Sequence, residues 1–173
     1  MSDNIQLFFD KIVYEPTSKN FFLIIIDEQR KKQLFLTVSA GVSNMVVSLI
    51  QGVQLQELQV YYDWLDNLDL FHIHCKELYI YNIDKEFVYS LLRQYTEDGV
   101  EYEIEINFIS GLILSLVGNV PIFISSENWK TFDLKQEHSK LPAIDTPEVF
   151  KNIIMDMKLP DLGDNNDDSK KQD

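Results

Sequence analysis

Two segments of the chain, Ser43-Asn-Met-Val-Val-Ser-Leu-Ile-Gln-Gly-Val53 and Ser110-Gly-Leu-Ile-Leu-Ser-Leu-Val-Gly-Asn-Val120, align without a gap. They are 67 residues apart, the difference between 110 and 43, and four of their positions are identical. Apolar residues recur at helical spacing in both segments, which predicts two helices that each bury one stripe. Gly52 is expected to end the first helix, and Gly118-Asn119 the second.

The strands that precede these helices repeat as well. Two strands separated by a polar turn are predicted within residues 21–38, and two more within residues 88–106. Asp98-Gly99 favours a hairpin in the second pair, because glycine accepts a positive φ without steric cost. Over residues 100–106 apolar residues alternate with Glu, which predicts one packed face and one solvated face.

A leading strand is predicted before each hairpin, at residues 6–14 and 77–83. The unit is therefore strand, strand, strand, helix, and the chain uses it twice. We predict an α+β fold with an internal duplication, in which mixed or antiparallel sheets pack against helices. A further helix is expected at residues 61–71, between the halves, and a short strand at residues 121–124.

Composition divides the chain into three regions. Residues 1–130 hold the duplicated unit and are predicted to form one domain. Residues 131–159 are predicted to form a connector and an amphipathic helix, whose start is marked by Thr146-Pro-Glu148. Residues 160–173 are rich in Asp, Asn and Lys, and we expect them to be disordered because they offer nothing to bury.

The chain is strongly acidic, with a formal net charge of -13 over 173 residues. Residues 161–173 contain five Asp and two Lys and so contribute -3, which leaves -10 on the rest of the chain. Proteins normally bind phosphate backbones through clustered Lys and Arg, and no such cluster occurs here. Nucleic acid is therefore not an expected partner.

A single cysteine, Cys75, excludes an intrachain disulfide and a zinc site built on cysteines. The first residues lack the basic and apolar pattern of a signal peptide. The longest apolar runs are much shorter than the roughly 20 residues that a membrane span needs. We therefore expect a cytoplasmic protein without a membrane partner.

Two stretches resemble a known family. Lys11-Ile-Val-Tyr-Glu-Pro-Thr-Ser-Lys-Asn20 leads into an apolar strand, and Val120-Pro-Ile-Phe-Ile-Ser125 follows a helix. Together with the order of the predicted elements, these stretches make the chain similar to the bifunctional nuclease domain family over roughly residues 5–129. The resemblance implies a compact α+β fold with DNase and RNase activity.

The chain departs from the signature of that family, which runs Asp-Ala-Arg-Pro-Ser-Asp-Ala. The aligned stretch here is Glu105-Ile-Asn-Phe-Ile-Ser-Gly111. Its first carboxylate is kept, whereas Asn107 replaces Arg, Phe108 replaces Pro and Ser110 replaces the second Asp. Of the Thr-His-Asp that opens the middle helix of the family, only Asp63 remains.

Phosphodiester hydrolysis needs charge stabilisation at phosphorus and an activated water, which metal ions or an Arg/His pair supply. The replacements remove most of the side chains that could hold such metal ions or form such a pair. We therefore predict a catalytically degenerate family member that acts through protein interaction or regulation, with a protein partner or as a homo-oligomer, and without a cofactor.

The alternative is an active metal-dependent nuclease with Glu105 and Asp63 as catalytic residues. In that case Asp63, Asp66 and Glu105 would hold Mg²⁺ or Mn²⁺. A small-molecule pocket between the halves is a third possibility.

Two other patterns each allow two interpretations. Asp63, Asp66 and Asp69 are spaced three apart, so they form either a cation site or a solvated helix face. His72 and His74 share one face of a predicted strand. They are either a metal-binding pair or exposed side chains without that role.

Overall fold

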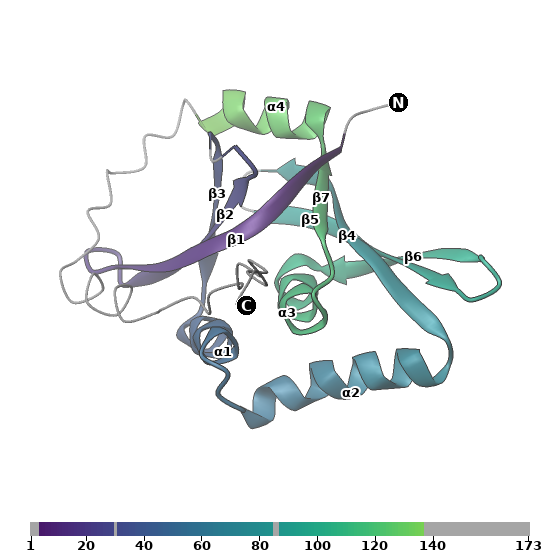
Figure 1. Ribbon diagram of the computed structural model, residues 1–173. Coiled ribbons are helices and arrows are strands. Elements are labelled where there is room, and N and C mark those ends of the chain that lie inside the picture. The colour runs from purple at the N-terminus through teal and green to yellow at the C-terminus, as the bar shows by residue number, and fades with distance from the viewer. Residues whose placement is uncertain (1–3, 30, 85–86, 137–173) are drawn as a thin grey trace, which may run out of the picture. The chain divides into compact units, whose positions relative to one another are not determined.

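The computed structural model describes residues 4–29, 31–84 and 87–136 (Figure 1). In this part of the chain the elements are β1 (Asn4–Glu15), β2 (Asn20–Asp27), β3 (Gln33–Val38), α1 (Ala40–Ile50), α2 (Gln56–Leu70), β4 (Ile73–Asp84), β5 (Phe87–Thr96), β6 (Glu101–Asn107), α3 (Phe108–Gly118), β7 (Ile122–Ser125) and α4 (Ser126–Gln136).

One mixed sheet carries the whole fold, with the strand order β3-β2-β1-β7-β4-β5-β6. All described neighbours are antiparallel except β4 and β7, which are parallel. The short strand β7 therefore joins two three-stranded meanders, each with its first strand innermost. This arrangement confirms the predicted α+β class.

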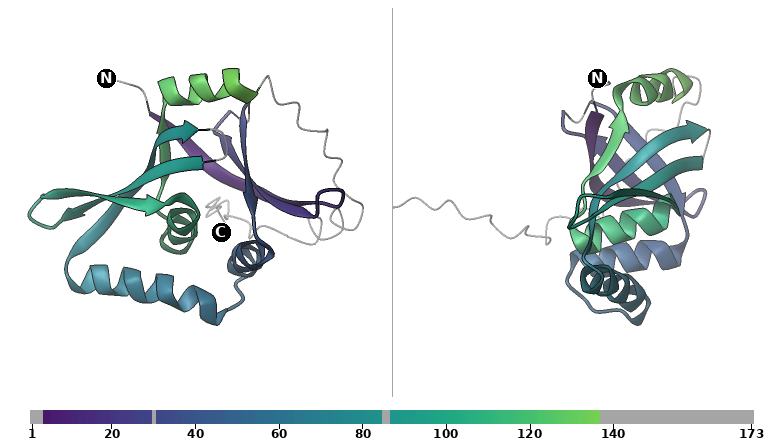
Figure 2. Two further views of the ribbon diagram at one scale, coloured as in Figure 1. Left: turned by 180° about the vertical axis from the view of Figure 1, so that it is seen from behind. Right: turned by 90° about the vertical axis from the view of Figure 1, so that its right-hand side faces the viewer.

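The helices pack at two places around this sheet (Figures 1 and 2). α1 packs against β2, and α3 packs against β4, β5 and β6. α2 bridges the halves by contacting α1, α3 and β4. α4 lies at the opposite end of β7 from α3 and contacts β1, β4 and β7. No helix within the described residues is long and apolar enough to cross a membrane.

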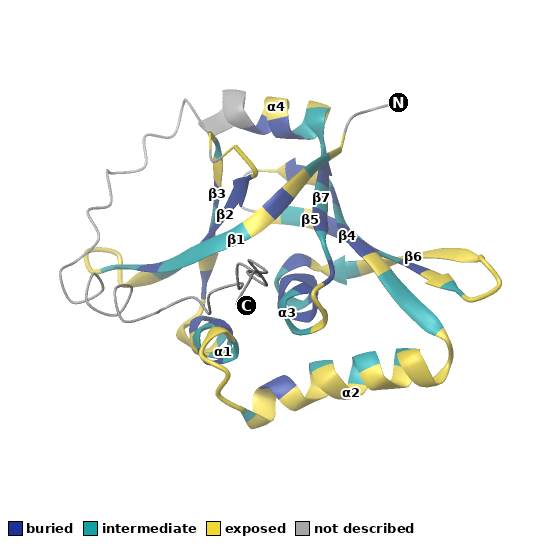
Figure 3. Cartoon of the chain, in the orientation of Figure 1, coloured by how far each residue is buried: buried dark blue, intermediate teal, exposed yellow. Residues whose placement is uncertain are grey.

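Both halves contribute to one apolar interior (Figure 3). Leu23 and Ile25 of the first half and Leu78 and Ile80 of the second are fully buried in the same cluster, together with Leu112 of α3. Side chains in such positions typically cost about 2–5 kcal/mol of stability when cut back to alanine. The sheet is therefore held by packing that spans both meanders.

The two aligned helices end in the same way. The Val53 N–H donates to the carbonyl oxygen of Ser48 at 2.8 Å, and the Val120 N–H donates to that of Ser115 at 2.9 Å. Between these residues Gly52 (φ 68°) and Asn119 (φ 52°) adopt positive φ. Both ends thus have the 6→1 hydrogen bond of a Schellman motif. The common descent of the halves stays a prediction.

Two helices differ from the expectations. α2 begins at Gln56, five residues before the predicted start, and no side chain caps it. α4 was not predicted, and it crosses residue 130, where the sequence suggested a boundary. Its apolar periodicity is weak, although the Ser125 hydroxyl, which accepts from the Asn128 N–H at 3.1 Å, is a recognisable helix-start signal. The helix predicted from Thr146 onward and the predicted disorder of residues 160–173 both fall within residues 137–173, which lie outside the described residues.

Candidate functional site

The stretch aligned with the nuclease signature, residues 105–111, lies at the junction of β6 and α3. Asn107 is the N-cap of α3, and its side-chain oxygen accepts hydrogen bonds from the Ile109 N–H at 3.0 Å and the Ser110 N–H at 3.3 Å. Phe108, the first helical residue, is buried. The position where the family has Arg is therefore used to begin a helix.

Glu105 also has a partner within the chain. It lies opposite Leu91 of β5, on the sheet face that turns away from α3, and its carboxylate accepts a hydrogen bond from the Tyr81 hydroxyl at 2.6 Å. This hydrogen bond raises the pKa of Tyr81 above its ordinary value. The phenol serves as a hydrogen-bond donor to Glu105.

Arg93 of β5 ties the three strands of the second meander together. Its guanidinium donates to Glu77 of β4 at 2.7 Å and to Glu103 of β6 at 2.8 Å. It also lies 4.0 Å from the centroid of the Tyr79 ring. Glu77 is almost fully covered, with a side chain 12% exposed, so this carboxylate depends on Arg93 for its charge balance.

Lys76 and Glu101 extend this polar surface toward the β5–β6 turn. Their side chains are 2.7 Å apart. The hydrogen bond raises the pKa of Lys76 and lowers that of Glu101. Each of the three glutamates of β6 therefore has a hydrogen-bond partner on β4 or β5.

Asp63 and Asp66 lie elsewhere, on the exposed side of α2. Asp63 accepts a hydrogen bond from Gln59 of the same helix at 2.8 Å. Across the described residues, no three His, Cys, Asp or Glu side chains are grouped so that they could hold a metal ion. The structure thus does not bring Asp63, Asp66 and Glu105 together as a metal site, and ligation by them stays a prediction.

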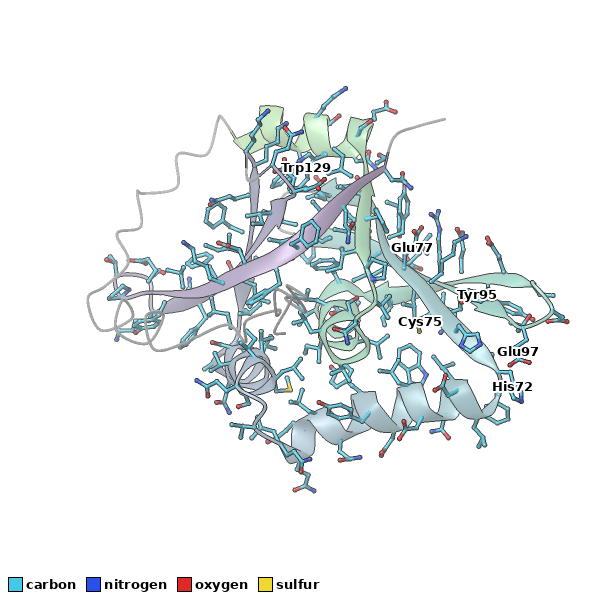
Figure 4. All side chains as sticks on the ribbon, viewed as in Figure 1. His72, Cys75, Glu77, Tyr95, Glu97 and Trp129 are labelled. Carbon is cyan, nitrogen blue, oxygen red and sulfur yellow. The ribbon has the colours of Figure 1, made fainter. Side chains whose placement is uncertain are left out.

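Of the two histidines in the described residues, His72 directly precedes β4, beside the turn end of the β5–β6 hairpin (Figure 4), and His74 lies in β4 opposite Tyr95 of β5. His72 Nδ1 is 3.1 Å from Glu97 Oε1, and both side chains are largely exposed. His74 is 3.8 Å from Asp69 and has its ring 5.3 Å from that of Tyr95. Each imidazole thus meets one carboxylate at the surface, and exposed contacts of this kind usually contribute little to stability.

The sequence placed the apolar side chains of residues 100–106 on a packed face, and for most of them this is wrong. Val100, Tyr102 and Ile104 are 45%, 47% and 43% exposed. Only Ile106, next to α3, is partly buried against the core. The alternation correctly separates the two faces of the strand, but it does not reveal where the covering helix ends.

Comparison of the chain with protein-family models and with curated proteins found no match. The resemblance to the bifunctional nuclease family therefore stays a prediction from the sequence.

Proposed function

We propose that this chain is a bifunctional nuclease family domain that has lost catalysis and acts by binding another protein. The observation that carries this proposal is the use of the polar side chains in residues 105–111. Glu105 is hydrogen-bonded to Tyr81, and Asn107 caps α3. Groups engaged in such internal hydrogen bonds serve the fold, whereas a hydrolytic site needs groups aimed at the substrate and at a water.

Charge supports the same proposal. The exposed side of α2 carries Asp63, Asp66 and Asp69, and the outer face of β6 carries three glutamates. The two cations nearest to those glutamates, Lys76 and Arg93, are already paired with carboxylates. A polyanionic backbone would be repelled by such surfaces, whereas a protein with complementary charge would be attracted.

We further propose a cytoplasmic location, which suits a chain that has one cysteine and so needs no oxidising compartment for disulfides. The binding partner is either a different protein or a second copy of this chain.

A cleavage assay tests the loss of catalysis. The purified full chain is incubated with plasmid DNA and with RNA in Mg²⁺ or Mn²⁺, beside Glu105→Ala and the matched control Glu103→Ala, which removes the neighbouring carboxylate of the same strand face. We expect no cleavage by any of the three. Cleavage by the wild type and Glu103→Ala that disappears in Glu105→Ala would overturn the proposal in favour of a metal-dependent nuclease. Binding of Mn²⁺ that requires Asp63, Asp66 and Glu105 together would lead to the same conclusion.

A further inference from the structure

β6 is an edge strand of the sheet (Figure 1). Within the described residues it pairs with β5 alone. An edge strand leaves a row of backbone N–H and C=O groups without partners in the sheet, and a strand from another chain can pair with that row.

The hydrogen bonds of the hairpin fix which residues face the open edge. The Thr96 N–H donates to the Val100 carbonyl oxygen at 3.0 Å, and the Ser90 hydroxyl donates to the Ile106 carbonyl oxygen at 2.9 Å. The even-numbered residues of β6 therefore face β5. Because the direction alternates along an antiparallel ladder, the odd-numbered residues, which include all three glutamates, present their backbone groups to the open edge.

The inner face of this edge is apolar and poorly covered. The turn end of the β5–β6 hairpin projects beyond α3 (Figure 1), and burial is low along the whole of β6 (Figure 3). Tyr102 and Ile104 are 47% and 43% exposed, although they share their face with the fully buried Leu92 of β5. An added strand with apolar residues on that face would cover both side chains.

The outer face of the same edge is acidic. The side chains of Glu101 and Glu103 are 64% and 54% exposed, in spite of their bonds to Lys76 and Arg93. Glu77 is the other partner of Arg93, and Glu105 is bonded only to the neutral Tyr81 hydroxyl, so four carboxylates stand against two cations and the face has a surplus of negative charge. Opposite charges directly across two strands are stabilising, and like charges are destabilising.

We propose that the open edge of β6 binds an extended segment of another protein in which Lys or Arg alternates with apolar residues. The segment adds an eighth strand, with its basic side chains beside the glutamates and its apolar side chains over Tyr102 and Ile104. The proposal rests on the proposed function for its choice of a protein as the partner.

Charge argues against two other occupants of this edge. A second copy that paired through its own β6 in the antiparallel direction would set one row of glutamates against the other. Residues 161–173 of this chain carry a net charge of -3 by sequence and would be repelled by the same row.

A peptide titration tests the proposal. The probe is a ten-residue synthetic peptide in which Lys and Val alternate, added to the full ¹⁵N-labelled chain. Two control peptides are used, one with the same composition but all Lys at one end, and one with Glu in place of Lys. We expect the alternating peptide to shift the amide signals of residues 101–107 while those of β3, the other edge, stay in place. We expect each control to bind at least about tenfold more weakly. The first control cannot present Lys on one face of a strand and Val on the other, and the second carries negative charge toward the glutamates.

Two variants at one position distinguish the contribution of the backbone to peptide binding from that of the side chain. Glu103→Ala removes the carboxylate, and Glu103→Pro removes it together with the N–H that faces the open edge. We expect Glu103→Pro to bind the peptide about tenfold more weakly than Glu103→Ala. Ile104→Lys, which places a charge among the apolar contacts without changing the backbone, should weaken binding by a similar factor and gives a second reading if Glu103→Pro does not fold.

Several results would overturn the proposal. These are equal affinities for alternating and grouped peptides, shifts on β3 in place of β6, or unchanged binding by a folded Ile104→Lys. A dimer in sedimentation that Ile104→Lys converts to a monomer would make a second copy the occupant and would also refute it. Peptide binding in a chain that cleaves RNA would refute only the proposed loss of catalysis, whereas absent binding in an inactive chain would refute only the edge site.

Discussion

The two meanders share their element order, yet their edge strands are covered very differently. In β3 the inward residues Leu34, Leu36 and Val38 are 2%, 6% and 9% exposed. In β6 the corresponding inner face is nearly half exposed at Tyr102 and Ile104. Apolar and polar residues alternate in both strands, and this alternation assigns each residue to a face of the sheet. Whether that face is buried depends on the helices that pack against it. The first half buries the inner face of its edge strand in the core, and the second half leaves that face partly exposed, although each edge strand has only one neighbour among the described strands.

The largest contrast is expected from cutting back one apolar side chain on each edge strand. Leu34→Ala should lower the free energy of unfolding by about 2–5 kcal/mol, because it opens a cavity in the packed interior. Ile104→Ala should change it by less than about 1 kcal/mol, because that side chain already meets water. Urea unfolding of the two variants measures the difference. Equal losses would show that β6 is packed as tightly as β3.

The approach of α3 to the sheet gives the next contrast. A Cβ atom on Gly111 would lie 2.7 Å from a Leu78 methyl group, whereas Asn44, at the aligned position of α1, is exposed. Gly111→Ala should therefore destabilise the fold by about 1–3 kcal/mol in spite of the better helix propensity of alanine. Asn44→Ala is the matched control.

Thermal or urea unfolding checks the pair. A Gly111→Ala variant as stable as the wild type would mean that α3 lies farther from β4 than the structure places it.

The helix ends provide a smaller effect and a test of the likeness between the halves. Gly52→Ala should cost about 1 kcal/mol, because a side chain at positive φ is strained. Asn119→Gly should be neutral or stabilising by a few tenths of a kcal/mol, since glycine tolerates the same conformation better. Equilibrium unfolding measures both. A Gly52→Ala variant without any loss of stability would contradict the shared helix ending.

The smallest expected effect concerns pH at the β1–β2 turn. The Glu15 carboxylate accepts from the Ser18 N–H at 2.6 Å and the Thr17 N–H at 2.8 Å. Hydrogen bonds, first those from Ser18, lower its pKa from 4.5 to about 2. Since the folded pKa is depressed, the stabilisation is present above pH 4.5 and is lost as the pH falls through about 2.

Carboxyl ¹³C titration measures this midpoint, and Glu15→Gln, which does not titrate, is the control. A midpoint close to 4.5 would show that the turn does not hold the carboxylate as described.

Local features of the fold were readable from the sequence. The hairpins, the paired helices and the strand after the second helix follow from apolar periodicity and from glycine at turns, which act over a few residues. α4 was missed because its burial comes from two aromatic residues that pack far from their own segment. Trp129 donates a hydrogen bond to Asp27, a buried residue 102 positions earlier. Such contacts leave no local pattern.

The candidate site shows the same limit. Asn107 was interpreted as a lost arginine, although an Asn before an apolar helix is also a capping signal. The network of Arg93 with Glu77 and Glu103 joins three strands, so it depends on a register that the sequence alone does not give. The exposure of Tyr102 and Ile104 depends on where α3 ends over the sheet, and periodicity carries no information about that.

Amide hydrogen exchange along β6, with and without the alternating Lys/Val peptide, tests the open edge most directly. We predict slow exchange at Tyr102, Ile104 and Ile106 in the free chain and fast exchange at the glutamates between them, which become protected when the peptide is added. Glutamate amides that are already protected in the free chain, or that stay unprotected with the peptide, would contradict an open edge that receives a partner strand.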